Sequence, residues 1–278
     1  MIMPGSRRYI FPHTGKETLR GPAETLPAAA LSAEISAKES MRLQLEPLNE
    51  RFSIYVSKEH TFGTDAFLLS DFAAPRRKDT VCDLGTGCGI IPLLWFRSQD
   101  AAPRHITAVD IQAKAIEQLK RTVRRNGLES RVTPLLADLK ALGGVLPAAS
   151  FDLITCNPPY KAPDAGIQSL SPSERIARHE VLCTLEDICR TASRLLRFGG
   201  SFCLCQRPER LVDVVDAMRG SGIEPKRLRF VQKNARSRPW LFLVQGKKGA
   251  KSFLRVEPPF LMDSPEAERL YRVKDTDM

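Results

Sequence analysis

The strongest constraint on the fold is a regular alternation of short apolar segments with longer amphipathic ones, which begins at residue 80. We expect strands at 80–84, 105–111, 132–136, 151–156, 201–205, 228–231 and 240–244, and helices at 90–96, 113–126, 180–196 and 211–218. Strands that alternate with helices of ten or more residues form a parallel or mostly parallel sheet covered on both faces. The predicted fold class is therefore α/β, and a ligand should bind at the carboxyl ends of the strands.

The segment before this alternation has a different character. Residues 1–40 show no sustained apolar periodicity and are not expected to pack, and a start of translation at Met41 would remove them. Alternating apolar residues up to position 56 predict a hairpin, and 65–73 predicts a short helix capped by Thr64 or Asp65. We expect one domain at 41–256, with its hairpin and short helix at 41–78 and its core at 79–246, followed by a C-terminal tail at 257–278.

The positive charge of the chain is concentrated in one segment. The formal net charge is +10, from 42 Lys and Arg against 32 Asp and Glu. Residues 219–255 contain eleven Lys or Arg and one acid, Glu224, so the rest of the chain is neutral. Local charge of this kind favours a docking face for a polyanion, with a solvated surface as the alternative.

The remaining composition excludes several classes of protein. No apolar run reaches the roughly 18 residues of a membrane span, and the first residues lack the apolar stretch of a secretory signal, so we expect a cytoplasmic protein. The seven cysteines form no Cys-x-x-Cys pair and complete no zinc spacing with the four histidines. We therefore expect reduced, buried thiols and no metal site.

A glycine-rich segment, Asp83-Leu84-Gly85-Thr86-Gly87-Cys88-Gly89, follows the first expected strand of the core. Glycines at every second position let the backbone turn tightly and approach a ligand closely. This spacing differs from the G-x-G-x-x-G that places a pyrophosphate on a helix N-terminus, which disfavours a dehydrogenase. Asp83 suits an amine or a bound water, and Asp110 ends the next strand where an acid can bind ribose hydroxyls. These features describe a site for S-adenosylmethionine, and a plain strand-to-helix turn is the alternative.

A second motif, Asn157-Pro158-Pro159-Tyr160, follows the fourth expected strand. The side-chain oxygen of Asn157 and the carbonyl of Pro158 can each accept an N–H from a target amine, which turns the lone pair of that amine toward a methyl donor. The prolines hold these acceptors rigidly, and Tyr160 offers a face on which a base can stack. A rigid turn with a surface tyrosine is the alternative.

The two motifs, together with Asp110 and Asp138, resemble class I S-adenosylmethionine-dependent methyltransferases of the amino-methylating kind over roughly residues 42–256. The resemblance implies a Rossmann-like seven-stranded sheet with helices on both faces, preceded by a small hairpin and helix. It also implies the cofactor residues: Asp83, Gly85, Gly87 and Gly89 around the methionine part, Asp110 at the ribose, and Ile111 and Asp138 at the adenine. Asp138 taken alone could instead cap a short helix at 139–142.

The choice of substrate also rests on resemblance. Adenine-N6 methyltransferases and the glutamine-N5 methyltransferases of release factors share the tetrapeptide, but the latter usually carry a helical N-terminal domain. Residues 62–65, Arg178-His179-Glu180 and 239–249 resemble the bacterial enzymes that N6-methylate adenine 37 of a valine tRNA, which implies a loop base presented to Tyr160. Amino-methylation of ribosomal RNA and RNA binding without catalysis are the alternatives, and the intact motifs argue against the second. We assign no chemistry to His179.

The basic segment is predicted to be an RNA clamp beside the carboxyl-end cleft. Its expected members are Lys226, Arg227, Arg229, Lys233, Arg236 and Arg238. Such charges would contact phosphates and contribute affinity but no sequence choice.

Overall fold

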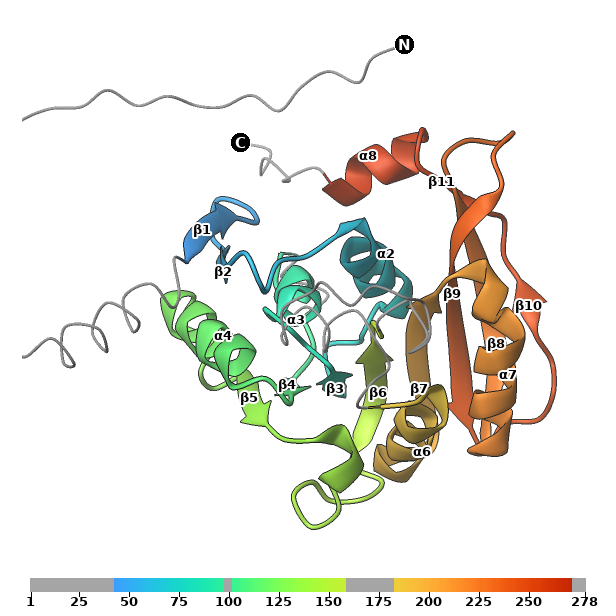
Figure 1. The fold of residues 1–278 in the computed structure, drawn as a ribbon, viewed down its shortest axis with the longest axis horizontal. Helices are drawn as coiled ribbons and strands as arrows, with labels where there is room; N and C mark the ends of the chain where they lie inside the picture. Colours follow the sequence, from blue (N-terminus) through green and yellow to red (C-terminus); the bar gives the residue numbers. More distant parts are fainter. Residues whose placement is uncertain (1–42, 98–101, 159–182, 272–278) are drawn as a thin grey trace, which may run out of the picture. The chain divides into compact units, whose positions relative to one another are not determined.

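The computed structural model describes residues 43–97, 102–158 and 183–271, and these form one large sheet with helices on both faces (Figure 1). The order of strands is β10-β8-β9-β7-β6-β3-β4-β5, and β11 pairs with β8. The strands are β3 (Thr80–Leu84), β4 (His105–Asp110), β5 (Val132–Leu136), β6 (Phe151–Cys156), β7 (Leu196–Gln206), β8 (Ile223–Gln232), β9 (Pro239–Lys248), β10 (Arg255–Val256) and β11 (Phe260–Leu261). Only β9 runs antiparallel to its neighbours among these strands. The predicted α/β class and the mostly parallel sheet are confirmed, but over the described residues the sheet has nine strands instead of seven, because the two-residue strands β10 and β11 extend it.

Two apolar clusters separate the faces of this sheet. One cluster contains side chains of α2 (Thr64–Ala73), α3 (Ile90–Trp95), α4 (Ala113–Arg125) and α8 (Pro265–Tyr271), together with the hairpin of β1 (Gln44–Pro47) and β2 (Ser53–Val56). The other contains side chains of η1 (Leu139–Ala141), α6 (Leu185–Leu195) and α7 (Leu211–Gly220), while η2 (Pro208–Arg210) links β7 to α7. In Figure 1, α2 and α3 lie on one side of the strands and α6 on the other. Helices on both faces, and the small hairpin and helix before the core, are as predicted.

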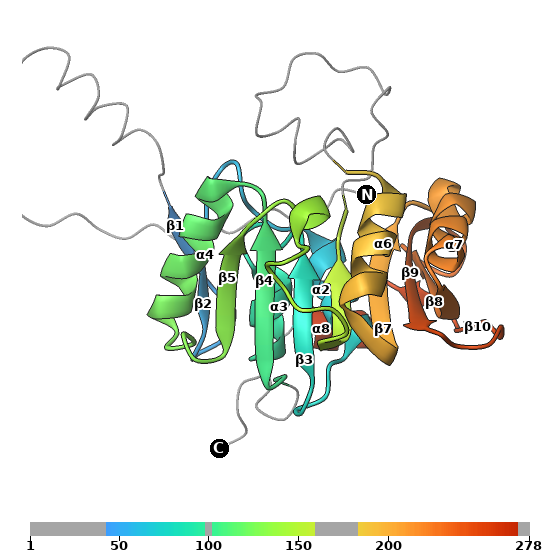
Figure 2. The same ribbon diagram turned by 90° about the horizontal axis from the view of Figure 1, so that it is seen from below.

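The path of the chain creates a crevice at one edge of the sheet. From β3 the chain passes outward to β4 and β5, and it then returns to β6 on the other side of β3. The arrows of β5, β4, β3 and β6 point the same way, so their carboxyl ends meet at one edge (Figure 2). Such a reversal of strand order is where ligands bind in open α/β sheets.

The region around α6 and β7 differs from the prediction. Within the described residues the helix expected at 180–196 begins at Leu185, because Thr184 and Asp187 form a reciprocal capping box. The pair Gly199-Gly200 follows the expected helix and is predicted to end it, but it lies within β7, where Gly199 has a φ of +76° and the pairing with β6 shifts register. A glycine pair can mark either a helix end or an irregular strand, and the apolar pattern did not separate the two cases.

The start of α2 and the segment after residue 257 also differ from the prediction. The first helical residue of α2 is Thr64, and Gly63 occupies the cap position without any side-chain hydrogen bond, so the predicted cap by Thr64 or Asp65 was wrong. Beyond residue 257, β11 and α8 pack onto the domain through buried Phe260 and Ala267. Elements of two and seven residues are too short to produce a periodic signal, which is why the sequence predicted only a tail there.

A glycine substitution tests how α3 packs on α4. Gly89 precedes α3 with a φ of +84°, and a Cβ there would overlap Leu119 Cδ1 on α4. Gly89→Ala should therefore lower the free energy of unfolding by at least about 1–2 kcal/mol, the cost of left-handed backbone alone, as measured by urea denaturation. The control is Gly143→Ala, whose Cβ would meet nothing within 4 Å. Equal stability of the two variants would contradict this packing.

Candidate active site

A cavity of about 230 Å³ lies at the carboxyl ends of the central parallel strands. Its wall is formed by the segments that follow β3, β4, β5 and β6, together with the loop between β2 and α2. Of the residues predicted for cofactor binding and catalysis, those on the described wall are Gly85, Gly87, Asp110, Ile111, Asp138, Asn157 and Pro158. Residues from four different loops thus come together at the edge that the fold class predicts.

The glycine loop after β3 is held open by backbone hydrogen bonds to the end of β4. Gly85 and Gly87 have φ values of +69° and +55°, and a Cβ added to either would meet nothing within 4 Å. The N–H of Gly87 donates to Asp110 Oδ2 at 2.8 Å, and the N–H of Thr86 donates to the Val109 carbonyl at 2.9 Å. The loop therefore leaves room for a ligand directly beside its backbone.

Asp110 is a buried carboxylate that can accept further hydrogen bonds. It is 6% exposed, and its Oδ1 accepts the N–H of Gln112 at 2.9 Å while Oδ2 accepts that of Gly87. Burial raises the pKa of this carboxyl, and the two backbone hydrogen bonds oppose that rise. A carboxylate has about four acceptor positions, so Asp110 can still accept the hydroxyl groups of a ribose.

His60 is a site residue that the sequence did not reveal. Its side chain is 5% exposed on the cavity wall, and its Nε2 has no hydrogen-bond partner within the described part of the chain. Burial lowers the pKa of the imidazole and nearby Asp110 opposes this, so the ring is favoured in its neutral form. Gln118 fixes the loop by donating to the His60 carbonyl at 3.0 Å. A single histidine outside any motif gave no signal by which to find it.

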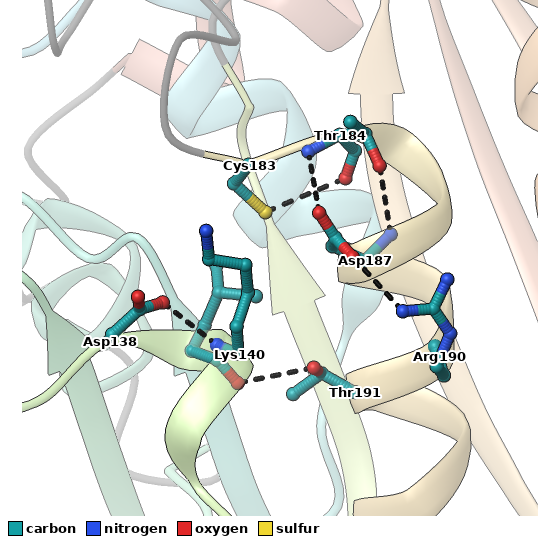
Figure 3. Close-up of polar contacts among 8 residues, drawn as sticks. Asp138, Lys140, Cys183, Thr184, Asp187, Arg190 and Thr191 are labelled. Carbon is teal, nitrogen blue, oxygen red and sulfur yellow. Dashed lines mark hydrogen bonds and ion pairs between the residues drawn. The ribbon is translucent and has the colours of Figure 1, made fainter.

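Asp138 caps a short helix and also lies on the cavity wall. Its Oδ1 accepts the N–H of Lys140 at 2.9 Å and so caps η1 (Figure 3), which confirms the predicted cap, while its contact with an adenine stays a prediction. Thr191 on α6 donates to the Leu139 carbonyl at 3.1 Å, which fixes η1 against the helix that follows the cavity wall. A cap uses one carboxylate oxygen, so the cap and a ligand contact are compatible.

Asn157 projects from the end of β6 with its amide group fixed by two side chains. Its Nδ2 donates to Asp65 Oδ2 on α2 at 2.8 Å, and its Oδ1 accepts the thiol of Cys205 on β7 at 3.1 Å. A carboxylate only accepts hydrogen bonds, so the NH₂ group must face Asp65 and the oxygen must face the other way. The sequence had suggested Asp65 only as a helix cap and Cys205 only as a buried thiol.

Two of the predicted cofactor residues in the glycine segment, Asp83 and Gly89, do not line the cavity. Asp83 is 1% exposed, accepts the Thr155 hydroxyl at 2.6 Å, and has no partner for its Oδ2 among the described residues. Burial raises the pKa of its carboxyl to about 7. Gly89 instead provides the close contact with Leu119. Tyr160 and His179 lie outside the described residues.

The predicted RNA clamp is divided between two edges of the sheet. Lys233, Arg236 and Arg238 are exposed in the loop between β8 and β9, at the edge that holds the cavity. Lys226 lies near the start of β8 and therefore at the opposite edge, where its Nζ donates to the Lys251 carbonyl at 3.0 Å.

The other two arginines of the predicted clamp hold the C-terminal segment in place. Arg227 donates to both carboxylate oxygens of Glu257, at 2.8 and 3.3 Å. Arg229 donates to both oxygens of Glu266, at 2.8 and 2.7 Å. Bidentate pairs of this kind already occupy the guanidinium groups, and the sequence counted these charges without their partners.

The described residues contain neither a cluster of metal ligands nor a membrane-spanning helix. Nowhere in 43–97, 102–158 or 183–271 do three His, Cys, Asp or Glu side chains gather as metal ligands would. Over the same ranges no helix combines the length and apolarity needed to span a bilayer. Six of the seven cysteines are buried, as predicted, and Cys183 is half-buried.

Comparison with known proteins identifies the family. The family model described as "Methyltransferase small domain" matches residues 48–209, which is more than half of the chain. This range contains every described residue of the cavity wall. The chain belongs to the methyltransferase small domain family. The predicted resemblance to methyltransferases is confirmed, and S-adenosylmethionine is the cofactor of the chain.

Individual relatives agree with this methyltransferase assignment. A tRNA1(Val) (adenine(37)-N6)-methyltransferase of Parabacteroides distasonis is 28% identical over 172 residues, which cover 59% of this chain and 67% of that protein. The protein with the same name from Pectobacterium carotovorum is 31% identical over 142 residues, covering 51% of this chain and 56% of that protein. The match thus spans between about half and two thirds of the length of these relatives.

Solved structures share the methyltransferase fold. A predicted O-methyltransferase of Agrobacterium tumefaciens superposes with a TM-score of 0.61 at 23% identity, covering 75% of this chain and 95% of that one. A tRNA m1G37 methyltransferase of Methanocaldococcus jannaschii gives a TM-score of 0.53 at 16% identity, covering 76% and 58%. At these identities the likeness establishes the fold alone.

The cavity of this methyltransferase fits its cofactor in charge as well as in shape. The described wall carries three carboxylates, Glu59, Asp110 and Asp138, and no Lys or Arg. Of these, Glu59 pairs at 3.2 Å with Lys114, which does not line the described wall. S-adenosylmethionine bears a sulfonium and an ammonium against one carboxylate, so a negative wall attracts it, whereas the pyrophosphate of a dinucleotide would be repelled. Open glycine backbone at Gly85 and Gly87 and spare acceptor positions on Asp110 fit its amino-acid and ribose parts.

The raised pKa of Asp83 predicts a pH dependence of stability. Its ordinary value is 3.8 and its value in the fold is about 7, so between these values the folded chain keeps a proton that the unfolded chain has lost. This contribution to the free energy of unfolding therefore falls as the pH rises through that window and is constant above it. The free energy of unfolding should fall between pH 5 and pH 8 in the wild type, as measured by urea unfolding. In Asp83→Asn this fall should be smaller by on the order of 1–4 kcal/mol. The same fall in variant and wild type would contradict the assignment.

Removal of the Asp110 carboxylate tests the ribose contact. Asp110→Ala should weaken binding of S-adenosylhomocysteine at least about tenfold in calorimetry, because hydrogen bonds to a charged group contribute about 1.5–3 kcal/mol. Glu129→Ala, at an exposed acid away from the cavity wall, is the matched control and should bind as wild type does. Unchanged affinity in Asp110→Ala would show that the ribose lies elsewhere.

Proposed function

We propose that the chain transfers the methyl group of S-adenosylmethionine to the N6 of an adenine in RNA, specifically adenine 37 in the anticodon loop of a valine tRNA. The observation that carries the proposal is the oriented amide of Asn157 on the wall of the cofactor cavity. The activity and substrate also have support from the printed names of relatives at 28–31% identity.

The residues around Asn157 account for how a weak nucleophile can react. The exocyclic amine of adenine has a delocalised lone pair, so its nitrogen must be drawn toward tetrahedral geometry. Asn157 Oδ1 accepts a hydrogen bond from the thiol of Cys205, and an amide oxygen of this kind is also the natural acceptor for one N–H of the amine. The carbonyl of Pro158, also on the wall, would take the other N–H. When bound, S-adenosylmethionine supplies an electrophilic methyl group on sulfur.

Rigidity is the main contribution of the surrounding side chains. Asp65 holds the NH₂ of Asn157, so the amide does not have to reorient when the amine arrives. Pro158 restricts the backbone beside it. A fixed pair of acceptors orders the amine in advance of transfer, which is where such a site gains rate. We propose that Tyr160 stacks on the extruded base, as predicted from the motif.

A nucleic acid substrate is consistent with the charges at the cavity edge. Lys233, Arg236 and Arg238 are exposed in one loop at this edge and make no ion pair with another described residue. Such a loop would contact the phosphates that flank a presented base. The proposed function therefore involves three of the six cations that were predicted to form the RNA clamp.

Transfer from labelled cofactor tests the function directly. Purified protein is incubated separately with total tRNA, ribosomal RNA and a peptide-chain release factor, and the labelled product is digested and identified. We expect N6-methyladenosine from the tRNA fraction alone, lost when adenine 37 of the valine tRNA is replaced by another base. Label in glutamine of the release factor or in ribosomal RNA would refute the proposed substrate.

Variants of Asn157 and Asp65 test the mechanism. Asn157→Ala should lower kcat by about 10²-fold or more, as loss of a preorganised polar group does, and should leave S-adenosylhomocysteine affinity unchanged. Asp65→Ala should lower kcat by roughly 10-fold, because the amide is then free to rotate. Asp213→Ala, at an exposed acid on α7, is the control. Equal loss of cofactor binding and turnover in Asn157→Ala would show that its role has been misplaced.

A further inference from the structure

We infer that the edge of the sheet opposite the cofactor cavity carries a second RNA-binding surface, a basic groove that takes the phosphate backbone of the substrate outside its target loop. The inference rests on the proposed RNA substrate and extends it to a part of the molecule that the catalytic site does not use. The groove has a volume of about 470 Å³ and is formed by the segment after α2, the start of β7 and the end of β9.

Unpaired cations dominate this groove. Its wall includes Arg76, Lys78 and Lys247, which are exposed and make no ion pair with any described residue. The acids on the same wall already have partners. Asp152 accepts Arg197 at 2.7 Å and the N–H of Thr80 at 2.8 Å, and Asp79 accepts the N–H of Arg76 at 2.9 Å.

Of the acids on the wall, Asp79 makes no ion pair with a described residue, so three such cations stand against one acid, and a bound polyanion would lower the repulsion among the excess positive charges. Arg227, also on the wall, has its charge taken by Glu257. The free positive charge of the groove therefore lies on three side chains from two separate segments, Arg76 and Lys78 before β3 and Lys247 on β9. The fold brings together cations that are about 170 positions apart in the sequence.

An exposed aromatic ring stands at the groove. Phe198 is 82% exposed, and a Cβ at Gly249 would overlap its ring, so the glycine lets the ring lie against the backbone. Nearby on the same edge, Lys226 lies 5.5 Å from the ring of Phe253, which is 74% exposed. Exposed rings beside cations are the combination by which proteins bind nucleic acid backbones and unpaired bases.

The position of the groove determines which part of an RNA can reach it. On β7 the chain advances nine residues from Arg197 at the groove to Gln206 at the cavity edge, a span of roughly 30 Å at about 3.3 Å per residue. A base in the cavity and a phosphate in the groove must therefore belong to distant parts of one folded RNA. A short hairpin held at the cavity should not reach the groove, whereas a whole tRNA should.

A flat anionic membrane is the competing partner for cations and exposed rings. The charge of this surface lies in a concave groove, which an RNA backbone can enter and a lipid surface contacts poorly. Binding to vesicles therefore serves as an opposing outcome of the test.

The experiment compares two RNAs and two sets of substitutions in the full chain. The groove variant is Arg76→Gln/Lys78→Gln/Lys247→Gln, and the matched control removes three exposed cations of α4, as Lys120→Gln/Arg121→Gln/Arg124→Gln. Dissociation constants are measured over a salt series for a full-length valine tRNA transcript and for its isolated anticodon stem-loop. S-adenosylhomocysteine affinity reports that each variant is folded.

For the groove variant we expect at least about tenfold weaker binding of full-length tRNA. The slope of the logarithm of the association constant against the logarithm of the salt concentration should become shallower by about 2–3, since each lost phosphate contact removes about 0.7–0.9 from it. Stem-loop and cofactor affinity should stay within twofold of wild type, and the control should match wild type on both RNAs. If the triple variant does not fold, Lys78→Gln and Lys247→Gln alone should each lower the slope by about 0.7–0.9.

Three results would overturn the inference. These are unchanged tRNA affinity, an equal loss for tRNA and stem-loop, or wild-type binding to phosphatidylserine vesicles that the groove substitutions abolish. Failure of the wild-type protein to bind either RNA would instead refute the proposed function, and the inference would fall with it.

Discussion

The hydrogen bond between Asp65 and Asn157 is the interaction on which the proposed catalytic arrangement depends. It joins the first turn of α2 to the end of β6 at 2.8 Å, and on the other side the amide accepts the thiol of Cys205 from β7. A hydrogen bond to a carboxylate is about twice as strong as one between neutral groups. Because three elements meet at one amide, its oxygen keeps a single orientation at the cavity wall.

At the glycine loop after β3 a carboxylate also fixes a flexible group, and this carboxylate, Asp110, is buried. Asp110 receives the N–H of Gly87, and Val109 receives that of Thr86, so the end of β4 holds the loop that follows β3. Glycine alone would leave this loop with many conformations. The parallel register of β3 and β4 brings the donors and acceptors together, and the site is therefore a consequence of strand order more than of any single motif.

The sequence predicted the parts of this protein that depend on local pattern. Buried strands such as β3 and β6 were predicted at their observed bounds, because a short apolar run between turn signals has few other solutions. It did not predict the partners of Asn157, which lie 92 and 48 positions away, nor the ion pair that occupies Arg229. Contacts of this kind are set by how elements pack, and no periodicity encodes them.

The central claim is that Asn157 Oδ1 accepts the target amine while Asp65 holds its NH₂. The most direct test is a crystal structure of the protein with S-adenosylhomocysteine and an anticodon stem-loop that contains adenine 37. The account predicts the adenine N6 at hydrogen-bond distance, about 2.8–3.2 Å, from Asn157 Oδ1, with Nδ2 still on Asp65. An adenine bound away from Asn157, or an amide turned so that its NH₂ faces the base, would contradict it.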